Sequence, residues 1–171
     1  RIRRRIMKNF FDSKCQQIPV NKNSFGLRDD EDGTPAYIIE IDKDSWQAEV
    51  INNAGYDIIF TAIDKCIVKD HEYKGRGRCE GMLTTEKHLY LVELKDRKNL
   101  SSGEMLDQLK STIRFLKEFH TEKLELFTHK KVFGCNSRKK GNFFVIDNEL
   151  QKSFKNEYGF RIDIQTNIVI V

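Results

Sequence analysis

The sequence has few of the residues that form metal knuckles or interrupt regular elements. Its four cysteines include no CxxC pair, and no histidine spacing completes a zinc site with them. Only two prolines occur, so helices and strands meet few breaks. We interpret the cysteines as buried or free thiols in a reducing compartment; they are Cys15, Cys66, Cys79 and Cys135.

Apolar runs of membrane-spanning length and a secretory leader are also missing. Their absence predicts a cytoplasmic protein with no membrane partner. The glycine patterns of P-loops, dinucleotide sites and nucleophile elbows do not occur, and the four histidines form no catalytic set. The sequence therefore offers no motif for nucleotide-dependent or serine-hydrolase chemistry.

What is present is an ordinary globular composition with many aromatic side chains. The 171 residues, of which 39% are hydrophobic and 33% charged, suit a single domain over residues 1–171. The 12 phenylalanines and 5 tyrosines predict an interior filled largely by aromatic rings. The net charge of +4 is too mild to indicate nucleic-acid binding by itself.

Apolar periodicity and turn residues predict an α/β (α+β) fold with a mixed central sheet. Residues 1–36 form an arm with no predicted element, and its acidic stretch RDDEDG is interpreted as a solvated loop. The spacing of the three central strands favours an antiparallel meander, and strand–helix–strand order favours a right-handed parallel crossover. The predicted elements are strands at 36–41, 56–68, 79–86, 89–95 and 130–136, helices at 44–55 and 101–120, and, within residues 137–171, a helix at 146–159 and a strand at 160–171.

The stretch LYLVELK places an acid and a base at the end of an apolar strand. Because strand side chains alternate, Leu91, Glu93 and Lys95 face one way. Both faces of the strand begin apolar, which predicts a central strand covered by a helix. A carboxylate buried there needs a partner or a cation, since desolvation disfavours its charged form. A salt bridge on an exposed strand end is the alternative interpretation.

The preceding strand offers a second carboxylate in RCEGML. If TTEKH turns the chain, Glu80 lies beside Glu93, and Gly81 leaves space for a close approach. Two carboxylates with water and backbone oxygens form an octahedral site for Mg²⁺ or Mn²⁺. Such an ion makes hydroxide available near neutral pH, and Lys95 beside it stabilises charge on a phosphoryl group. The pattern therefore predicts phosphodiester hydrolysis.

Glu80, then ELK at 93–95 on the adjacent strand, then an amphipathic helix, resemble the PD-(D/E)xK nuclease superfamily. The resemblance implies a restriction-endonuclease-like αβββαβ core, which residues 44–136 fit, with residues 137–171 adding a C-terminal helix and strand. The sequence RCE stands where the family has its PD. The site residues implied by the resemblance are Glu80 and Glu93 as metal ligands, with Lys95 and Gln108 as further catalytic residues.

Two more acids and a basic turn complete the candidates. By the resemblance, Glu49 in the predicted first helix is a candidate additional acid. Asp64 is unusual within its apolar strand and is a second candidate, although a structural pair with Lys65 also explains it. The turn KGRGR either forms a hairpin loop held open by charge or contacts phosphate through Lys74, Arg76 and Arg78.

These features predict a metal-dependent nuclease whose partner is nucleic acid, with DNA favoured over RNA by the resemblance. A catalytically inactive nuclease-like module that binds nucleic acid or a protein partner is the alternative, and a homodimer stays open. A third interpretation is an unrelated α/β domain in which the ExK residues lie on the surface.

Overall fold

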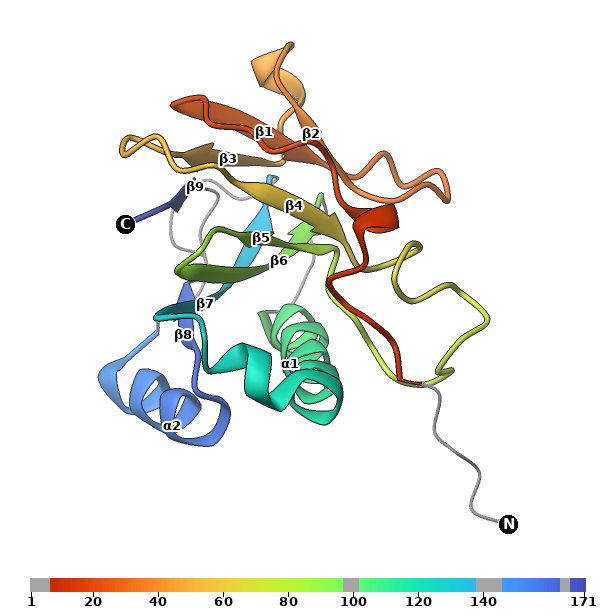
Figure 1. Ribbon diagram of the computed structural model, residues 1–171, viewed down its shortest axis with the longest axis vertical. Coiled ribbons are helices and arrows are strands. Elements are labelled where there is room, and N and C mark those ends of the chain that lie inside the picture. The colour runs from red at the N-terminus through yellow and green to blue at the C-terminus, as the bar shows by residue number, and fades with distance from the viewer. Residues whose placement is uncertain (1–6, 97–101, 138–145, 164–166) are drawn as a thin grey trace.

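A computed structural model describes residues 7–96, 102–137, 146–163 and 167–171, which form a mixed α+β fold of three layers (Figure 1). A five-stranded sheet lies in the middle, with helices α1 (Ser102–Leu124) and α2 (Asn148–Tyr158) on one face. Its order is β4 (Ile59–Ala62), β5 (Gly81–Thr84), β6 (His88–Lys95), β7 (His129–Asn136) and β8 (Arg161–Asp163). A second sheet covers the other face in the order β2 (Tyr37–Ile39), β1 (Ser24–Arg28), β3 (Ala48–Ile51) and β9 (Asn167–Val169).

Strand β6 is buried on both faces because it divides two apolar cores. Leu89 and Leu91 pack in the core that contains Leu109 of α1. Tyr90 and Val92 pack in the core shared with the second sheet. The alternation of β6 therefore sends odd-numbered residues toward the helices and even-numbered residues toward the second sheet.

The central part of the predicted element order is confirmed. Strands β4, β5 and β6 form an antiparallel meander, and β7 returns parallel to β6 after α1. Helix α2 ends at Gly159, which has φ +76° and accepts the left-handed conformation of a helix C-cap without a steric cost. The predicted strand at 56–68 is too long, since β4 spans only Ile59–Ala62 and the chain then turns at the Asp64–Val68 bridge.

The predicted helix at 44–55 is wrong. The segment forms a short 3₁₀ turn, Lys43–Ser45, followed by strand β3, which pairs with β1 and β9. Ala48 and Val50 are buried while Glu49 is half-exposed, which is the alternation of a strand. Pairing with neighbouring strands therefore overrides the helix propensity of this segment. Gly26 of β1 makes this possible, because a Cβ there would overlap the ring of Trp46.

Two further expectations for the ends of the chain are corrected. The N-terminal arm contains β1, a strand with no counterpart in the sequence prediction. The C-terminal segment 160–171 is not one strand, because β8 joins the central sheet and β9 joins the second sheet. Each short strand is stabilised by its neighbours in a different layer, which the local sequence does not reveal.

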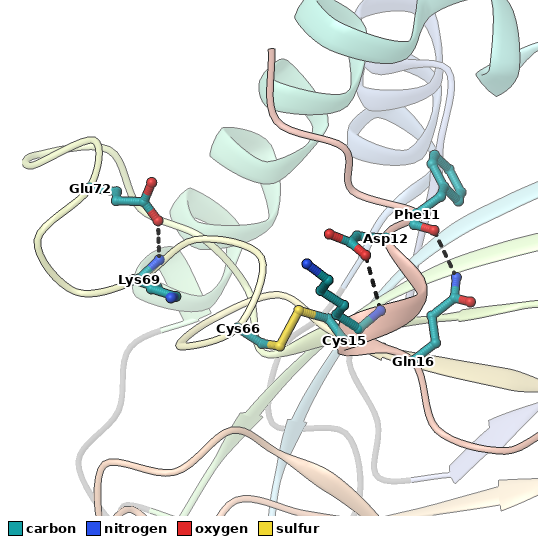
Figure 2. The surroundings of a disulfide bond; sticks show 8 residues. Phe11, Asp12, Cys15, Gln16, Cys66, Lys69 and Glu72 are labelled. Atoms are coloured by element: carbon teal, nitrogen blue, oxygen red, sulfur yellow. Dashed lines mark hydrogen bonds between the residues drawn. A yellow bond between two sulfur atoms is a disulfide. The ribbon is translucent and has the colours of Figure 1, made fainter. Parts of the chain in front are cut away.

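The interpretation of all four cysteines as thiols is also wrong. Cys15 and Cys66 form a disulfide between the N-terminal 3₁₀ helix Ser13–Cys15 and the turn after β4 (Figure 2). The same segment bonds to β4 through its backbone, with the Gln17 N–H donating to the carbonyl of Phe60. Sequence spacing could not predict this pair, because packing brings together residues that are 51 positions apart. Cys79 and Cys135 are buried thiols.

Neither helix within the described ranges is long and apolar enough to cross a membrane. Helix α1 is amphipathic instead, and its apolar residues pack on the central sheet. A kink at His120 bends its last turn, and the ring Nε2 of His120 accepts a hydrogen bond from the Phe10 N–H at 3.0 Å. This bond and the disulfide attach the N-terminal segment to two different layers.

Reduction of the disulfide is expected to lower the free energy of unfolding, because the unfolded chain regains the entropy of the loop that the cross-link closes. For a separation of 51 residues we expect a loss of about 2–4 kcal/mol. The measurement is the urea midpoint with and without dithiothreitol. The Cys15→Ser variant should have the lower urea midpoint in both conditions, because it has no cross-link for dithiothreitol to reduce. An equal midpoint for the wild type in both conditions would contradict the cross-link.

Candidate active site

The end of strand β6 brings the acid and base of the ExK stretch to the helix-facing side of the central sheet. Leu91 packs toward α1, so the alternation of the strand places Glu93 and Lys95 on the same face. The β5–β6 register pairs Gly81 with Val92, and continuing it by one residue sets Glu80 opposite Glu93. The antiparallel ladder therefore brings the two carboxylates together at the end of the sheet.

Glu93 is the least solvated acid of this group. Its side chain is 1% exposed, and neither carboxylate oxygen has a hydrogen-bond donor among the described residues. Lys95 Nζ lies 4.0 Å from Glu93 Oε1, an ion pair at the limit of direct contact. Glu80 is 7% exposed. A buried carboxylate without donors is costly, so this arrangement favours a ligand that supplies positive charge.

Burial raises the pKa of both glutamates above the ordinary carboxyl value of 4.5. For Glu80, repulsion from the charge of Glu93 adds to the rise. For Glu93, attraction to Lys95 and a contact with Glu80 partly offset it. The metal-free pair therefore favours states in which at least one carboxyl group carries a proton.

Asp64 lies beside this pair and is itself paired with two cations. Its carboxylate accepts a hydrogen bond from Arg78 Nε at 2.8 Å and lies 3.5 Å from the ammonium of Lys65. The sequence alternative of a structural Asp64–Lys65 pair thus describes part of what the structure contains. Repulsion from Asp64 still contributes to the raised pKa of Glu80 and Glu93, which places it in the same electrostatic environment.

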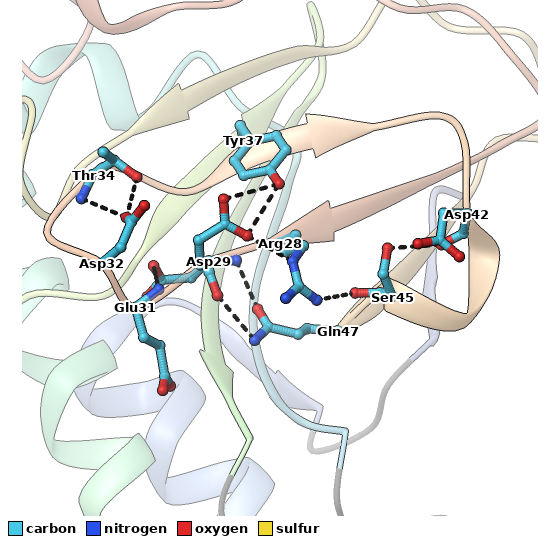
Figure 3. A network of polar contacts seen from close by, with 10 residues as sticks. Arg28, Asp29, Glu31, Asp32, Thr34, Tyr37, Asp42, Ser45 and Gln47 are labelled. Atoms are coloured by element: carbon cyan, nitrogen blue, oxygen red, sulfur yellow. Dashed lines mark hydrogen bonds and ion pairs between the residues drawn. The ribbon is translucent and has the colours of Figure 1, made fainter.

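Asp29 is an acid of this environment that the sequence interpretation missed. It follows β1 of the second sheet and is 7% exposed, although RDDEDG was interpreted as a solvated loop. Gln47 holds its backbone in place, with Oε1 accepting from the Asp29 N–H at 2.7 Å and Nε2 donating to the Asp29 carbonyl at 3.1 Å (Figure 3). Repulsion from Asp29 is the third contribution that raises the pKa of Glu80, after burial and repulsion from Glu93. No local signal marks Asp29, because its position depends on the packing of the two sheets.

Gln108 of α1 faces Gly77, in the segment that leads into β5, rather than the carboxylates. Its side-chain Oε1 is buried without a hydrogen-bond donor among the described residues and touches the position that a Cβ on Gly77 would occupy. One turn further, the Thr112 hydroxyl donates to the Gln108 carbonyl at 2.9 Å and accepts from the Cys79 N–H at 2.7 Å. This link fixes the chain just before Glu80 against α1.

The remaining candidates lie apart from the carboxylate pair or are engaged elsewhere. Glu49 belongs to β3 in the second sheet, where hydrogen bonds from Ser24 and Lys43 hold its pKa below the usual range. Arg76 pairs with Glu118 at 3.0 Å, and Arg78 with Asp64. Lys74 is exposed on the same turn.

The carboxylate pair suits a hard divalent cation. Within the described ranges, no three Asp, Glu, His or Cys side chains are gathered in the geometry of a metal site. Two carboxylates with water ligands nevertheless form a common Mg²⁺ site, and the Glu93 oxygens have no competing donor in the part of the chain that the structure covers. The residues present therefore fit a hydrated Mg²⁺ or Mn²⁺ ion.

No family model, curated protein or solved structure matches the chain.

The metal-free protein should lose stability as the pH rises above the ordinary carboxyl pKa. The folded state raises the pKa of Glu80 and Glu93, so it resists their ionisation more than the unfolded chain does. We expect Glu93→Gln to stabilise the protein in EDTA at about pH 8 by at least about 1.4 kcal/mol, the equivalent of one pKa unit. The gain should vanish near pH 4, where the wild-type carboxyl is neutral in both states.

Urea unfolding over a pH series measures this effect. Glu86→Gln is the matched control, because Glu86 is exposed in the turn between β5 and β6. A Glu93→Gln variant that is less stable than the wild type at alkaline pH without metal would contradict an uncompensated buried charge.

Proposed function

We propose that the protein is a metal-dependent nuclease that hydrolyses phosphodiester bonds in nucleic acid. The observation that carries the proposal is the carboxylate of Glu93, buried without a hydrogen-bond donor among the described residues and set opposite Glu80. A carboxylate pair of this kind is stable when both groups ionise around a divalent cation. Lys95 on the same face supplies the charge that phosphoryl transfer requires.

In this proposal the carboxylates of Glu80 and Glu93 hold Mg²⁺ or Mn²⁺. When bound, the ion supplies Lewis-acid stabilisation and lowers the pKa of coordinated water. The ammonium of Lys95, half-buried at the end of β6, stabilises negative charge on the phosphoryl oxygens and orients the attacking water. Burial at the sheet end excludes bulk water, which strengthens both interactions.

Asp64 supports the pair from a neighbouring element, and Gln108 acts apart from the pair. Asp64 adds negative charge near Glu80, while its contacts with Arg78 and Lys65 keep it in place. Gln108 lines a cavity beside Gly77, where its side-chain amide orients a group of the substrate. The arrangement of meander, helix and parallel strand supports the resemblance to PD-(D/E)xK nucleases, although β3 stands where that family has its first helix. The same resemblance favours DNA over RNA.

A binding module without catalytic activity is the second candidate. Arg78 and Lys65 pair with Asp64, so cations of the chain itself already offset part of the negative charge that a metal ion would otherwise balance. A nuclease-like scaffold in this state would hold nucleic acid or a protein partner through its surface. Binding by such a module would not depend on a divalent cation.

Cleavage assays test the proposal directly. Purified protein is incubated with single- and double-stranded DNA and RNA in Mg²⁺, Mn²⁺ or EDTA. We expect cleavage in the presence of metal and its loss in EDTA. Lys95→Ala should lower the rate by about 100-fold or more, because it removes a charge that acts in the transition state. Glu86→Ala, in the exposed β5–β6 turn, should cleave like the wild type.

Metal binding provides a second readout that does not depend on finding the substrate. Mn²⁺ should raise the thermal midpoint of the wild type and have little effect on Glu93→Gln, since ligand binding to the native state stabilises it. Equal stabilisation of both proteins by Mn²⁺ would rule out the carboxylate pair as the metal site. Nucleic-acid binding without cleavage in any metal would favour the binding module.

A further inference from the structure

A cavity of about 460 Å³ lies between the glycine-bearing turn after β4 and the side of α1. The turn contributes Gly75, Arg76 and Gly77, and α1 contributes Gln108, Lys110 and Arg114. Gly75 and Gly77 have no side chains, so the backbone itself lines the cavity at these two positions. The cavity is separate from the ExK pair, which lies at the end of β6.

Positive charge dominates the polar groups of the cavity. The guanidinium of Arg76 stacks on Phe115 at 3.6 Å from the ring centroid and uses one nitrogen for Glu118. Arg114 uses one nitrogen for the hydroxyl of Tyr158 at 3.1 Å. These contacts orient both guanidinium groups and leave their other N–H groups for an anion. Lys110 has no ion-pair partner among the described residues, so three cations face Asp107 of the wall and Glu118 beside it.

The cavity is also lined by a hydrogen-bond acceptor, the carboxylate of Asp107. Gln108 lines the cavity as well, and the Oε1 of this side chain is buried without a donor among the described residues. Gly77 permits the close approach of this oxygen, since any Cβ there would overlap it. A simple anion would pair with the cations but would be repelled by Asp107. A nucleotide offers both kinds of group, because its phosphate accepts hydrogen bonds while its base amino or sugar hydroxyl groups donate them.

The wall of the cavity is hydrogen-bonded to the segment that leads into Glu80. The Thr112 hydroxyl accepts from the Cys79 N–H and donates to the Gln108 carbonyl, so the chain passes from the cavity to Glu80 within a few residues. We propose that this cavity is a nucleotide subsite that binds one phosphate and the adjoining sugar or base of a nucleic-acid strand, beside the phosphodiester held at Glu80 and Glu93. This inference rests on the proposed nuclease function for the identity of the neighbouring site, but its binding chemistry is independent of cleavage.

Nucleic-acid binding in EDTA tests the subsite without requiring cleavage. The probe is a fluorescein-labelled oligonucleotide of mixed sequence, as single-stranded DNA, single-stranded RNA and duplex DNA, followed by anisotropy over a salt series. Lys110→Ala is the test variant, because Lys110 makes no described contact that its loss would break. We expect it to bind several-fold more weakly at low salt and to lower the slope of log affinity against log salt by about 0.7 on a single strand, the value of one phosphate contact.

The matched control is Lys22→Ala, which removes the same charge beside Glu40, a residue of the second-sheet side. It should bind like the wild type. Equal binding by Lys110→Ala and the wild type, or no binding by the wild type, would overturn the subsite. Free 5′-mononucleotide is a competing arm: if it binds as tightly as the strand and in a Lys110-dependent way, the site is for free nucleotides and the strand subsite is wrong.

A small diester separates this proposal from the nuclease proposal. Bis(p-nitrophenyl) phosphate reaches the carboxylate pair without needing the subsite, so its Mn²⁺-dependent hydrolysis should be the same in Lys110→Ala and the wild type. Loss of this hydrolysis in Lys110→Ala would place Lys110 at the cleavage site and overturn the subsite. If the wild type cleaves nothing yet binds strands in a Lys110-dependent way, the subsite stands and the nuclease proposal fails.

Discussion

Burial of the Glu93 carboxylate at the end of β6 is the constraint on which the candidate site depends. Two cores exclude water from both faces of the strand, and the described residues offer no hydrogen-bond donor to either oxygen. The neighbouring strand sets Glu80 opposite and so adds a second negative group to a place of low dielectric constant. The fold tolerates this through protonation, through the ammonium of Lys95 at 4.0 Å from Glu93 Oε1, or through a bound cation. Each of these routes links the stability of the fold to the charge state of the Glu80–Glu93 pair.

The second sheet decides which groups surround that pair. It covers the face of the central sheet opposite the helices. It also places Asp29 near the site, where two hydrogen bonds from the Gln47 side chain hold the Asp29 backbone. The Cys15–Cys66 disulfide is attached next to Asp64 and Lys65, so the N-terminal segment restrains the turn that contains both charges. The layer that replaces a predicted helix is therefore part of the electrostatics of the site and more than a cover for apolar surface.

The cations of this region are unevenly shared among its acids. Burial opposes the charged form of Lys65, yet attraction to Asp64, Asp29 and other acids raises its pKa. Arg78 adds a second positive group to Asp64. Lys65 and Arg78 therefore offset the charge of Asp64 and, in part, of Asp29. Glu80 and Glu93 are left as the acids with the least positive charge around them. A divalent ion would therefore bind where the chain supplies the fewest positive charges of its own.

How much of this the sequence predicted depends on the range of the interaction. Alternation along LYLVELK and the short turn before it were enough to place Glu93, Lys95 and Glu80 together, because a β-ladder converts local spacing directly into register. Helical periodicity was enough for α1, and the Gly159 cap for the end of α2. These features depend on neighbours within one strand pair or one helix.

The features that the sequence missed depend on contacts between distant segments. Residues 44–55 became strand β3 because β1 and β9 pair with it, and the side chain of Trp46 fits over Gly26. The disulfide joins residues whose separation carries no pairing signal, and Asp29 is buried only once the second sheet packs. The sequence by itself determined the strand alternation and the acids of the ExK stretch. The tertiary structure decided which other charges reach them, because burial and partners exist only after the layers have assembled.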